Sequence, residues 1–260
     1  EEEACGRRPW RFVMQACSLR VLDRDASNRL IYADVLSQAV SGELVGMLNY
    51  ASMVALCPSA AEQQEAIADA ESERCHALAF RAVARDLGVP LVEDPRARYW
   101  RRLREAFQRQ VAAGDFLACL VVQELMLESL AVSMYRAVAE ATDGLMARTF
   151  GTIALDEESH LEHAVTTLRA ACELDRVGFE TRTERLHGEV MTVIAEMVAP
   201  RCSSGPCGVC AERCVKESLG DIGLSAPVLR GKALRLYLQS LDRVGVRGEK
   251  SLRWVANLPA

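Results

Sequence analysis

The sequence has little of what marks β-rich, disordered or nucleic-acid-binding proteins. Its 260 residues include only 8 prolines and 16 glycines, and half of them are hydrophobic, which excludes extensive disorder. Strand-like alternation of apolar and polar residues between turns is also lacking. The 31 basic residues are outnumbered by 36 acidic ones, and the net charge of −5 gives no overall attraction for nucleic acid or acidic membranes. A folded helical protein without a nucleic-acid partner is therefore predicted.

Long apolar runs are scarce as well. Stretches such as Phe116 to Val122 stop well short of the roughly 20 apolar residues that a helix needs to cross a bilayer, so no membrane span is predicted. We also expect no signal peptide, because no charged start precedes an apolar centre and a small-residue cleavage site. The 10 cysteines are mostly scattered along apolar helical faces of a large chain, unlike those of a small disulfide-rich secreted domain. These features together predict a cytoplasmic location.

What the sequence does contain is apolar residues every three to four positions, the period of an amphipathic helix. Four long helices are predicted, over residues 28–56, 59–87, 96–140 and 144–174. Ser59 and Gly88 are the expected caps of the second helix, and the third is expected to kink at Gly114-Asp115. Shorter helices follow, so the chain is predicted to be all-α.

One domain is the default for a chain of this length. We predict an N-terminal segment over residues 1–27 and a single domain over residues 28–260. The turn-rich segment 201–214 is predicted to be a cysteine-rich loop within that domain.

Two copies of a Glu-x-x-His motif lie in the second and fourth predicted helices. The first copy is Glu73 with His76, and the second is Glu157 with His160. Positions three apart share one face of a helix, so the carboxylate and the imidazole can reach one metal centre. One such motif is weak evidence, because glutamate is common on solvated helix faces. Two motifs in separate helices of a chain with only 4 histidines predict a metal site.

A dinuclear carboxylate site in a helical bundle needs one more glutamate from each of the other two helices. The first helix contains Glu43 among small and apolar residues, where an unpaired carboxylate is costly. The third helix contains both Glu124 and Glu128, which lie one turn apart and share a face. Helical spacing alone leaves the choice between these two open.

An internal repeat selects Glu128. A shift of 84 or 85 residues places Glu43, Tyr50, Glu73 and His76 on Glu128, Tyr135, Glu157 and His160. Glu124 would need a shift of 81. Glu124 is then interpreted as a solvated residue, with a base near the metals or a contact for a polar substrate as alternatives. In this arrangement Glu73 and Glu157 bridge two ions, and oxygen and nitrogen ligands favour iron, with manganese as the alternative.

At these residues the sequence resembles the cyanobacterial aldehyde-deformylating oxygenases, also called aldehyde decarbonylases, which are ferritin-like di-iron enzymes. The resemblance extends from about Leu30 to Leu241. It is carried by the stretches SGELVGMLNY, ERCHALAF, FQRQVAAGDFLACLVVQELMLESLAVSMY, DEESHL and LGDIGLSAPVLR. The resemblance implies a ferritin-like four-helix bundle core with additional C-terminal helices.

The resemblance also implies a reaction. A long-chain fatty aldehyde in a hydrophobic channel would be cleaved with O2 and external electrons to formate and an alkane or alkene that is one carbon shorter. The electron donor implied is a ferredoxin with its reductase. The residues that the resemblance places beside the metals or along the channel are Tyr50, Gln123 and Tyr135.

Two of the departures from the family pattern bear on the function. One is Glu124, and the other is a cluster of four cysteines that could hold zinc or an iron–sulfur cluster or form a redox pair. These are Cys202, Cys207, Cys210 and Cys214. They motivate an alternative hypothesis, a related di-iron oxygenase that acts on another small hydrophobic substrate, for example by amine N-oxygenation. His163 is interpreted as a helix-face residue, and the arginine-rich run 96–104 as a solvated face or a docking site for an acidic electron donor.

Overall fold

The structure is a computed structural model that describes residues 26–199, 216 and 219–259. The predicted N-terminal segment, except for its last two residues, lies outside this part of the chain. The cysteine-rich loop also lies outside it, and with it the proposed second metal site at Cys202, Cys207, Cys210 and Cys214. The division into one domain and a leading segment therefore stays a prediction.

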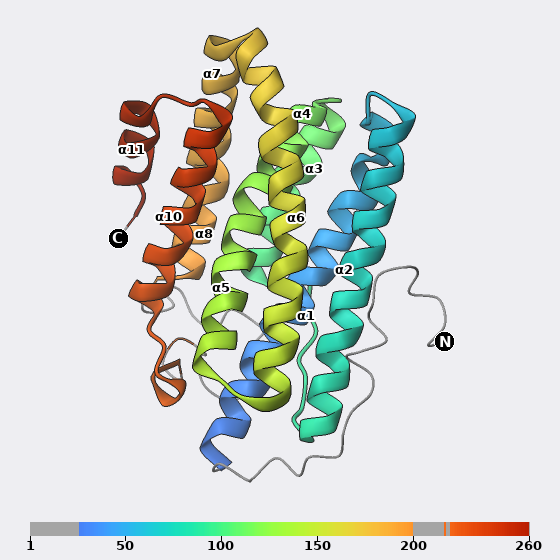
Figure 1. Cartoon of the computed structure of the whole chain (residues 1–260), viewed down its shortest axis with the longest axis vertical. Helices are drawn as coiled ribbons and strands as arrows, with labels where there is room; N and C mark the ends of the chain where they lie inside the picture. The colour runs from blue at the N-terminus through green and yellow to red at the C-terminus, as the bar shows by residue number, and fades with distance from the viewer. Residues whose placement is uncertain (1–25, 200–215, 217–218, 260) are drawn as a thin grey trace.

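Four helical segments run side by side along the long axis of the molecule and form its core (Figure 1). They are α1 (Ala26–Met53), α2 (Ala60–Leu87), the continuous stretch from α4 (Phe116–Leu120) to α5 (Glu128–Ala141), and α6 (Gly144–Leu174). α1 packs mainly on α2, and α5 packs mainly on α6. The described part of the chain contains no strand, so the predicted all-α class is confirmed. The core consists of two helical hairpins that face each other.

The predicted ends of the second helix are confirmed. The side chain of Ser59 accepts a hydrogen bond from the backbone N–H of Glu62, which satisfies one of the free donors of the first turn. Gly88 ends the helix in the left-handed conformation at φ +64°, which glycine adopts at no steric cost. A short 3₁₀ turn at Val54–Leu56 links α1 to this helix.

The predicted third helix over 96–140 is wrong as a single element. The chain instead forms a separate helix, α3 (Arg98–Ala112), which packs against α1. Gly114 has φ +68°, and the side chain of Asp115 accepts a hydrogen bond from the N–H of Ala118. The pair therefore ends one helix and caps the next. The bundle helix begins only at α4.

A π-helical turn interrupts this bundle helix. It covers Val121–Leu127, between α4 and α5, and the backbone N–H of Glu128 donates to the carbonyl of Gln123, five residues earlier. Such a turn holds one residue more than an α-helical turn, and it is frequent at functional sites. Residue spacing that assumes an α-helix is therefore misleading across this segment.

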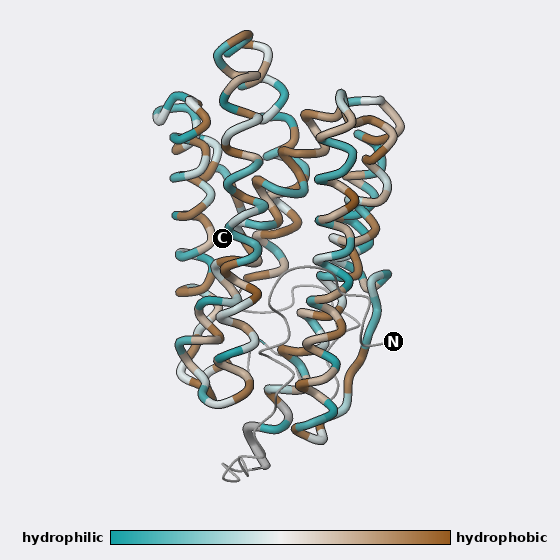
Figure 2. The backbone as a smooth tube through the Cα atoms, turned by 45° about the vertical axis from the view of Figure 1, so that its right-hand side comes forward, coloured by the Kyte–Doolittle hydropathy of each residue, from teal (hydrophilic) through white to brown (hydrophobic). Residues whose placement is uncertain are grey.

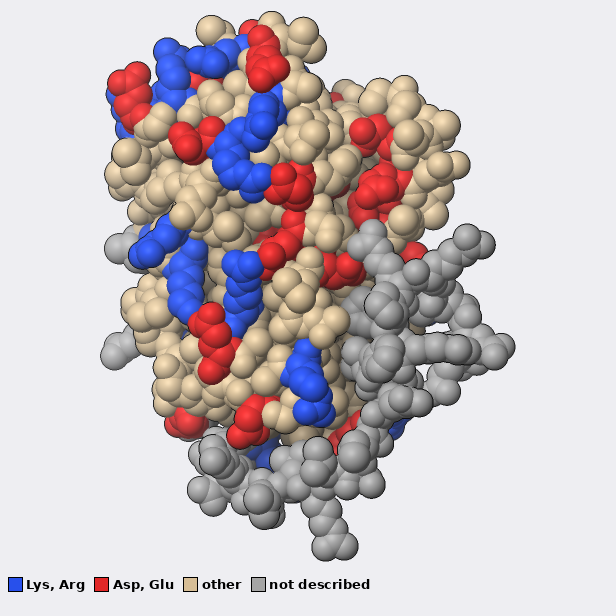
Figure 3. All heavy atoms as spheres, in the orientation of Figure 1, with Lys and Arg blue, Asp and Glu red and all other residues tan. Residues whose placement is uncertain are grey.

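Additional helices follow the bundle, as predicted for the C-terminal part. They are α7 (Arg176–Leu186), α8 (Thr192–Met197), α10 (Ala226–Val244) and α11 (Gly248–Ala256), with a second π-helical turn at His187–Met191 and a 3₁₀ turn at Leu219–Ile222. α10 lies against α5 and α6. Figure 3 shows many Lys and Arg side chains on this side of the molecule, interspersed with acidic ones.

The apolar core is divided into two clusters by a layer of polar side chains. Along α1, Val40 belongs to one cluster and Val45 to the other, and Glu43 lies between them. Along α6, the same change occurs between Ala154 and Leu161, on either side of the second Glu-x-x-His motif. Figure 2 shows hydrophobic and hydrophilic residues alternating along each helix, as in amphipathic helices. The predicted metal ligands therefore lie at mid-height in the bundle, shielded by apolar residues at both ends.

Two segments, Ile31–Leu56 and Phe116–Ala141, are long and apolar enough to cross a membrane by length and composition. Core helices of water-soluble bundles meet the same criterion. The most apolar window of the second segment is 83% buried within the protein, and that of the first is 50% buried. The two segments are therefore weak evidence for a membrane span.

Candidate metal centre

The four helices of the bundle bring all six predicted ligands together. Each of these residues is no more than 5% exposed. They are Glu43, Glu73, His76, Glu128, Glu157 and His160. α1 and α5 each provide one carboxylate, whereas α2 and α6 each provide a carboxylate and an imidazole from one helical turn.

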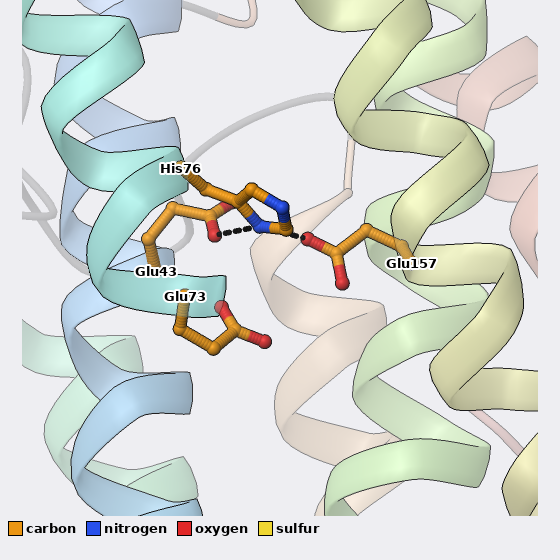
Figure 4. A group of neighbouring side chains, drawn as sticks. All are labelled: Glu43, Glu73, His76 and Glu157. Atoms are coloured by element: carbon orange, nitrogen blue, oxygen red, sulfur yellow. Dashed lines mark hydrogen bonds and ion pairs between the residues drawn. The ribbon is translucent and has the colours of Figure 1, made fainter. Parts of the chain in front are cut away.

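The six residues form two overlapping groups of possible ligands. One group is Glu43, Glu73, His76 and Glu157, and Figure 4 shows it with His76 directed between Glu43 and Glu157. The other group is Glu73, Glu128, Glu157 and His160. Within each group, one ligand atom from every residue lies within 4.8 Å of the others. Glu73 and Glu157 belong to both groups, which is the position that bridging carboxylates occupy.

Glu157 joins the two halves of the site. Its Oε1 lies 2.9 Å from Nδ1 of His76, and its Oε2 lies 2.9 Å from Nδ1 of His160. Nδ1 of His76 also lies 3.0 Å from Oε2 of Glu43, and Nδ1 of His160 lies 3.7 Å from Oε1 of Glu73. Both imidazoles thus direct the same ring nitrogen toward the carboxylates.

The other ring nitrogen of each histidine faces a further carboxylate. Nε2 of His76 lies 2.9 Å from Oδ2 of Asp156, to which Ser72 also donates at 2.6 Å. Nε2 of His160 lies 3.4 Å from Oδ1 of Asp69. Metal-binding histidines usually have such a partner, which orients the ring and raises its basicity. Sequence reasoning missed both aspartates, although Asp69 lies one turn before Glu73 on the same face of α2.

The two repeat-related tyrosines cross between the halves of the site. Tyr50 donates from its hydroxyl to Oε1 of Glu128 at 3.5 Å, and Tyr135 donates to Oε1 of Glu43. Each tyrosine therefore contacts the glutamate of the other hairpin. Both rings are buried, so these contacts hold the carboxylates of Glu43 and Glu128 in place within the core.

Gln123 reaches Glu128 because of the π-helical turn. In an α-helix, residues five apart point about 140° away from each other. Here Nε2 of Gln123 donates to Oε1 of Glu128 at 2.8 Å, and its Oε1 accepts from Asn49 at 2.8 Å. Arg104 in turn donates to Oδ1 of Asn49 at 3.3 Å. The predicted position of Gln123 beside the metals thus corresponds to a hydrogen-bonded chain that orients Glu128.

The interpretation of Glu124 as a solvated residue is wrong. Its side chain is fully buried, and its Oε2 lies 2.7 Å from Nδ1 of His163 rather than beside Glu128. The π-helical turn separates the two glutamates, which an α-helix would place on one face. His163, interpreted as a helix-face residue, has a side chain that is only 22% exposed.

The buried charges perturb one another strongly. Burial and the nearby charge of Glu157 raise the pKa values of Glu73 and Glu128 well above normal. Burial would also raise the pKa of Glu157, but the charges of His76 and His160 and its short contacts with both imidazoles lower it to about 2. Burial opposes the charged form of His160, yet its contacts with Glu157 raise its pKa to about 10. Without metal, Glu73, Glu128 and His160 therefore hold their protons to higher pH than usual.

The donor set fits two divalent cations. The four carboxylates carry four negative charges, which two such ions neutralise while both imidazoles stay neutral. In the described part of the chain, Oε1 of Glu73, Oε2 of Glu157 and Nδ1 of His160 are buried without a well-oriented hydrogen bond, although the last two lie 2.9 Å apart, and this is costly unless a cation binds them. Oxygen and nitrogen donors without sulfur suit iron or manganese. The six residues could therefore hold a dinuclear centre.

Gly46 leaves room for the carboxylate of Glu73. A Cβ at Gly46 would lie 2.8 Å from both Cδ and Oε2 of Glu73, closer than van der Waals contact allows. Gly46→Ala is therefore expected to displace Glu73 and to weaken metal binding about 10- to 100-fold, the effect of disturbing a ligand's support. The fold should persist, because alanine favours a helix over glycine by about 1 kcal/mol.

Metal content after dialysis and the melting temperature measure these two effects. Gly231→Ala in α10 is the matched control, because a Cβ there meets nothing within 4 Å. If Gly46→Ala keeps normal metal affinity, Glu73 does not need this space to bind.

A cavity opens onto one side of the centre. Its wall includes Glu43, Glu73, Glu128 and Glu157, together with Gln123 and Tyr135. The rest of the wall is largely apolar and comes from α1, α3, α5, α6, α8 and α10. It includes Val35, Ala39, Trp100, Met134, Phe150 and Leu229. Apolar pockets with a few convergent polar groups are typical of small-molecule sites. The arrangement can place an apolar molecule beside the carboxylates.

Comparisons with known proteins found a family match and a structural match. The family model described as long-chain fatty aldehyde decarbonylase matches residues 25–198. Among solved structures, the chain is similar to a Synechococcus protein described as having aldehyde deformylating oxidase activity. That match has 24% sequence identity and a TM-score of 0.75, and it covers 90% of this chain and 99% of the other. At this identity the structural match shows the fold, and it confirms the predicted ferritin-like bundle.

Proposed function

The chain belongs to the long-chain fatty aldehyde decarbonylase family, and from this premise we propose that it cleaves a fatty aldehyde with O2. The products are formate and a hydrocarbon one carbon shorter than the substrate. The observation that carries the proposal is the apolar cavity, whose wall includes four carboxylates of the candidate metal centre. In this proposal the alkyl chain packs against the apolar wall and the aldehyde group lies beside the carboxylates.

Two iron ions are the proposed cofactor, with manganese as the alternative. Glu43 and His76 hold one ion in this proposal, and Glu128 and His160 hold the other. Glu73 and Glu157 belong to both groups of ligands and would be shared by the two ions. When bound and reduced, the ions supply the activation of O2.

The residues around the ions position the ligands and exclude water. Tyr135 donates a hydrogen bond to Glu43 and Tyr50 donates one to Glu128. Gln123 fixes the orientation of Glu128. Trp100 and other apolar side chains keep water away from the aldehyde. A dry site strengthens the interactions of the carboxylates and limits side reactions of activated oxygen.

The reaction needs an external reductant. Atoms and charge balance when an aldehyde, O2, four electrons and four protons give the hydrocarbon, formic acid and water. A ferredoxin with its reductase is the proposed source of the electrons. The arginine-rich run 96–104 is partly neutralised, because Nη1 of Arg102 lies 2.5 Å from Oε2 of Glu196. Arg101 is more exposed and is a better candidate for contact with an acidic donor.

Incubation of the iron-loaded protein with O2, a reducing system and long-chain aldehydes is expected to release formate and the shortened hydrocarbon in equal amounts. An aldehyde labelled with ¹³C at its carbonyl carbon should place the label in formate. The metal-free protein is the control. Absence of labelled formate over a series of chain lengths would overturn the proposal.

The alternative hypothesis, a related oxygenase that acts on another substrate such as an amine, loses one of the two observations that motivated it. Glu124, which suggested a contact for such a substrate, is not among the residues that line the described cavity, and it faces His163 instead. The other motive, the cysteine cluster, lies outside the described residues. The incubation with labelled aldehyde distinguishes the two hypotheses, because an amine oxygenase would release no formate from an aldehyde.

A further inference from the structure

A third group of possible ligands lies beside the dinuclear centre. It consists of Asp69 on α2, Glu124 in the π-helical turn and His163 on α6, and one ligand atom from each lies within 4.8 Å of the others. Asp69 and Glu124 are buried, and His163 lies between the core and the surface. None of the three lines the cavity described above, so the group is separate from the proposed substrate site.

Glu124 lacks a full set of partners in this group. Its side chain is completely buried, and its Oε2 faces Nδ1 of His163 at 2.7 Å. Its other oxygen, Oε1, has no hydrogen-bond partner in the part of the chain that the structure describes. A buried carboxylate oxygen without a partner is costly, and a bound cation would remove that cost.

The contacts of His163 repeat the pattern found at the dinuclear centre. His76 and His160 each direct Nδ1 toward the ligand carboxylates and Nε2 toward an aspartate outside them. His163 likewise directs Nδ1 toward Glu124, and its Nε2 lies 3.3 Å from Oε2 of Glu62. A carboxylate behind the outer ring nitrogen is the usual surrounding of a metal-binding histidine.

We infer that Asp69, Glu124 and His163 bind a third divalent cation. Two carboxylates and one imidazole suit Mn²⁺, Fe²⁺ or Zn²⁺, with water completing the coordination. The inference goes beyond the proposed function, because a cation can bind here without any reaction at the dinuclear centre. Asp69 also contacts Nε2 of His160, so the third cation and the dinuclear centre share a side chain. The side chains of His163 and Glu62 are 22% and 25% exposed, so this group lies closer to solvent than the ligands of the dinuclear centre.

Titration of the full chain with Mn²⁺ tests the inference. Metal content after equilibrium dialysis is expected to be three ions per chain in the wild type and two in Glu124→Gln. Electron paramagnetic resonance should show the hyperfine sextet of an isolated Mn²⁺ ion only in the wild type, beside the broader signal of a coupled pair. Glu140→Gln on α5, an exposed glutamate paired with Lys232, is the matched control and should keep three ions.

Two results would overturn the third site. One is a wild-type protein that binds only two ions, and the other is a Glu124→Gln variant that still binds three. His163→Gln provides a second test at a partly exposed position if the Glu124 variant does not fold. Failure of the dinuclear centre would look different, because the coupled signal would then be missing while the sextet remained.

Discussion

Replacement of Glu157 by glutamine is expected to remove both ions of the dinuclear centre and to abolish formate release. Each of the two carboxylate oxygens lies 2.9 Å from a different imidazole of the site. Glutamine keeps the shape but offers one acceptor oxygen, and its other terminal atom is an NH2 donor that repels a cation. Because Glu157 is itself a proposed ligand, the loss of metal affinity should exceed the roughly 10- to 100-fold effect of removing an outer partner.

Metal content per chain and formate release measure the effect of Glu157→Gln. Glu162→Gln is the matched control, because Glu162 lies on the same helix, has a side chain that is 58% exposed and pairs with Arg243. Glutamine preserves the shape of the buried side chain, and the melting temperature of the Glu157→Gln variant shows that it stays folded when metal content is compared. A Glu157→Gln protein that retains two ions at normal affinity would contradict the bridging assignment.

Loading the metal-free protein with two divalent ions is expected to raise its melting temperature by about 10–20 °C at neutral pH. A ligand at a hundred times its Kd stabilises the folded state by about 2.7 kcal/mol, so two sites contribute roughly 5 kcal/mol. For a chain of this size, 1 kcal/mol shifts the melting temperature by about 2–4 °C. Scanning calorimetry before and after removal of the ions with a chelator measures the shift.

The metal-induced shift is also expected to grow as the pH rises from about 5 to about 8. The pKa values of Glu73 and Glu128 are raised in the folded protein by burial and by the charge of Glu157. The metal-free fold therefore binds more protons than the unfolded chain above the usual glutamate pKa of about 4.3, and it loses stability as the pH rises. The pKa of His160, raised to about 10, acts in the same direction above about pH 6.5.

Glu157 acts in the opposite direction. Its pKa of about 2 gives stability that is present above the usual glutamate pKa and is lost as the pH falls toward 2. The metal-free protein should thus be most stable in mild acid. Metal binding requires deprotonated carboxylates, so the loaded protein gains most at the higher pH. A melting-temperature shift that does not change between about pH 5 and about pH 8 would contradict this account, and Glu157→Gln should show little shift at either pH.

Features that lie within one helix could be predicted from the sequence. The caps at Ser59 and Gly88 depend only on nearby residues, and the structure has both. The face shared by Glu73 and His76 follows from helical geometry alone. The repeat also singled out Glu128, and the structure places Glu128 with the other five predicted ligands and Glu124 apart from them. Whether these six bind metal stays a prediction.

Features that join different helices depended on the tertiary structure. The contact of Tyr135 with Glu43 crosses from one hairpin to the other, and the contact of Asp156 with His76 joins α6 to α2. No spacing along the chain specifies such pairs, because they depend on which helical faces meet in the packed bundle. They were therefore invisible to arguments from periodicity.

The sequence by itself determined the all-α class, the two Glu-x-x-His motifs and the repeat that relates the halves of the site. Only the tertiary structure decided the surroundings of Glu124. Spacing on an ideal helix placed Glu124 beside Glu128, but the π-helical turn at Val121–Leu127 changes the number of residues per turn at that point. The backbone conformation thus turns Gln123 toward Glu128 and Glu124 toward His163. That choice depends on packing around the turn, which a pattern of residue types does not contain.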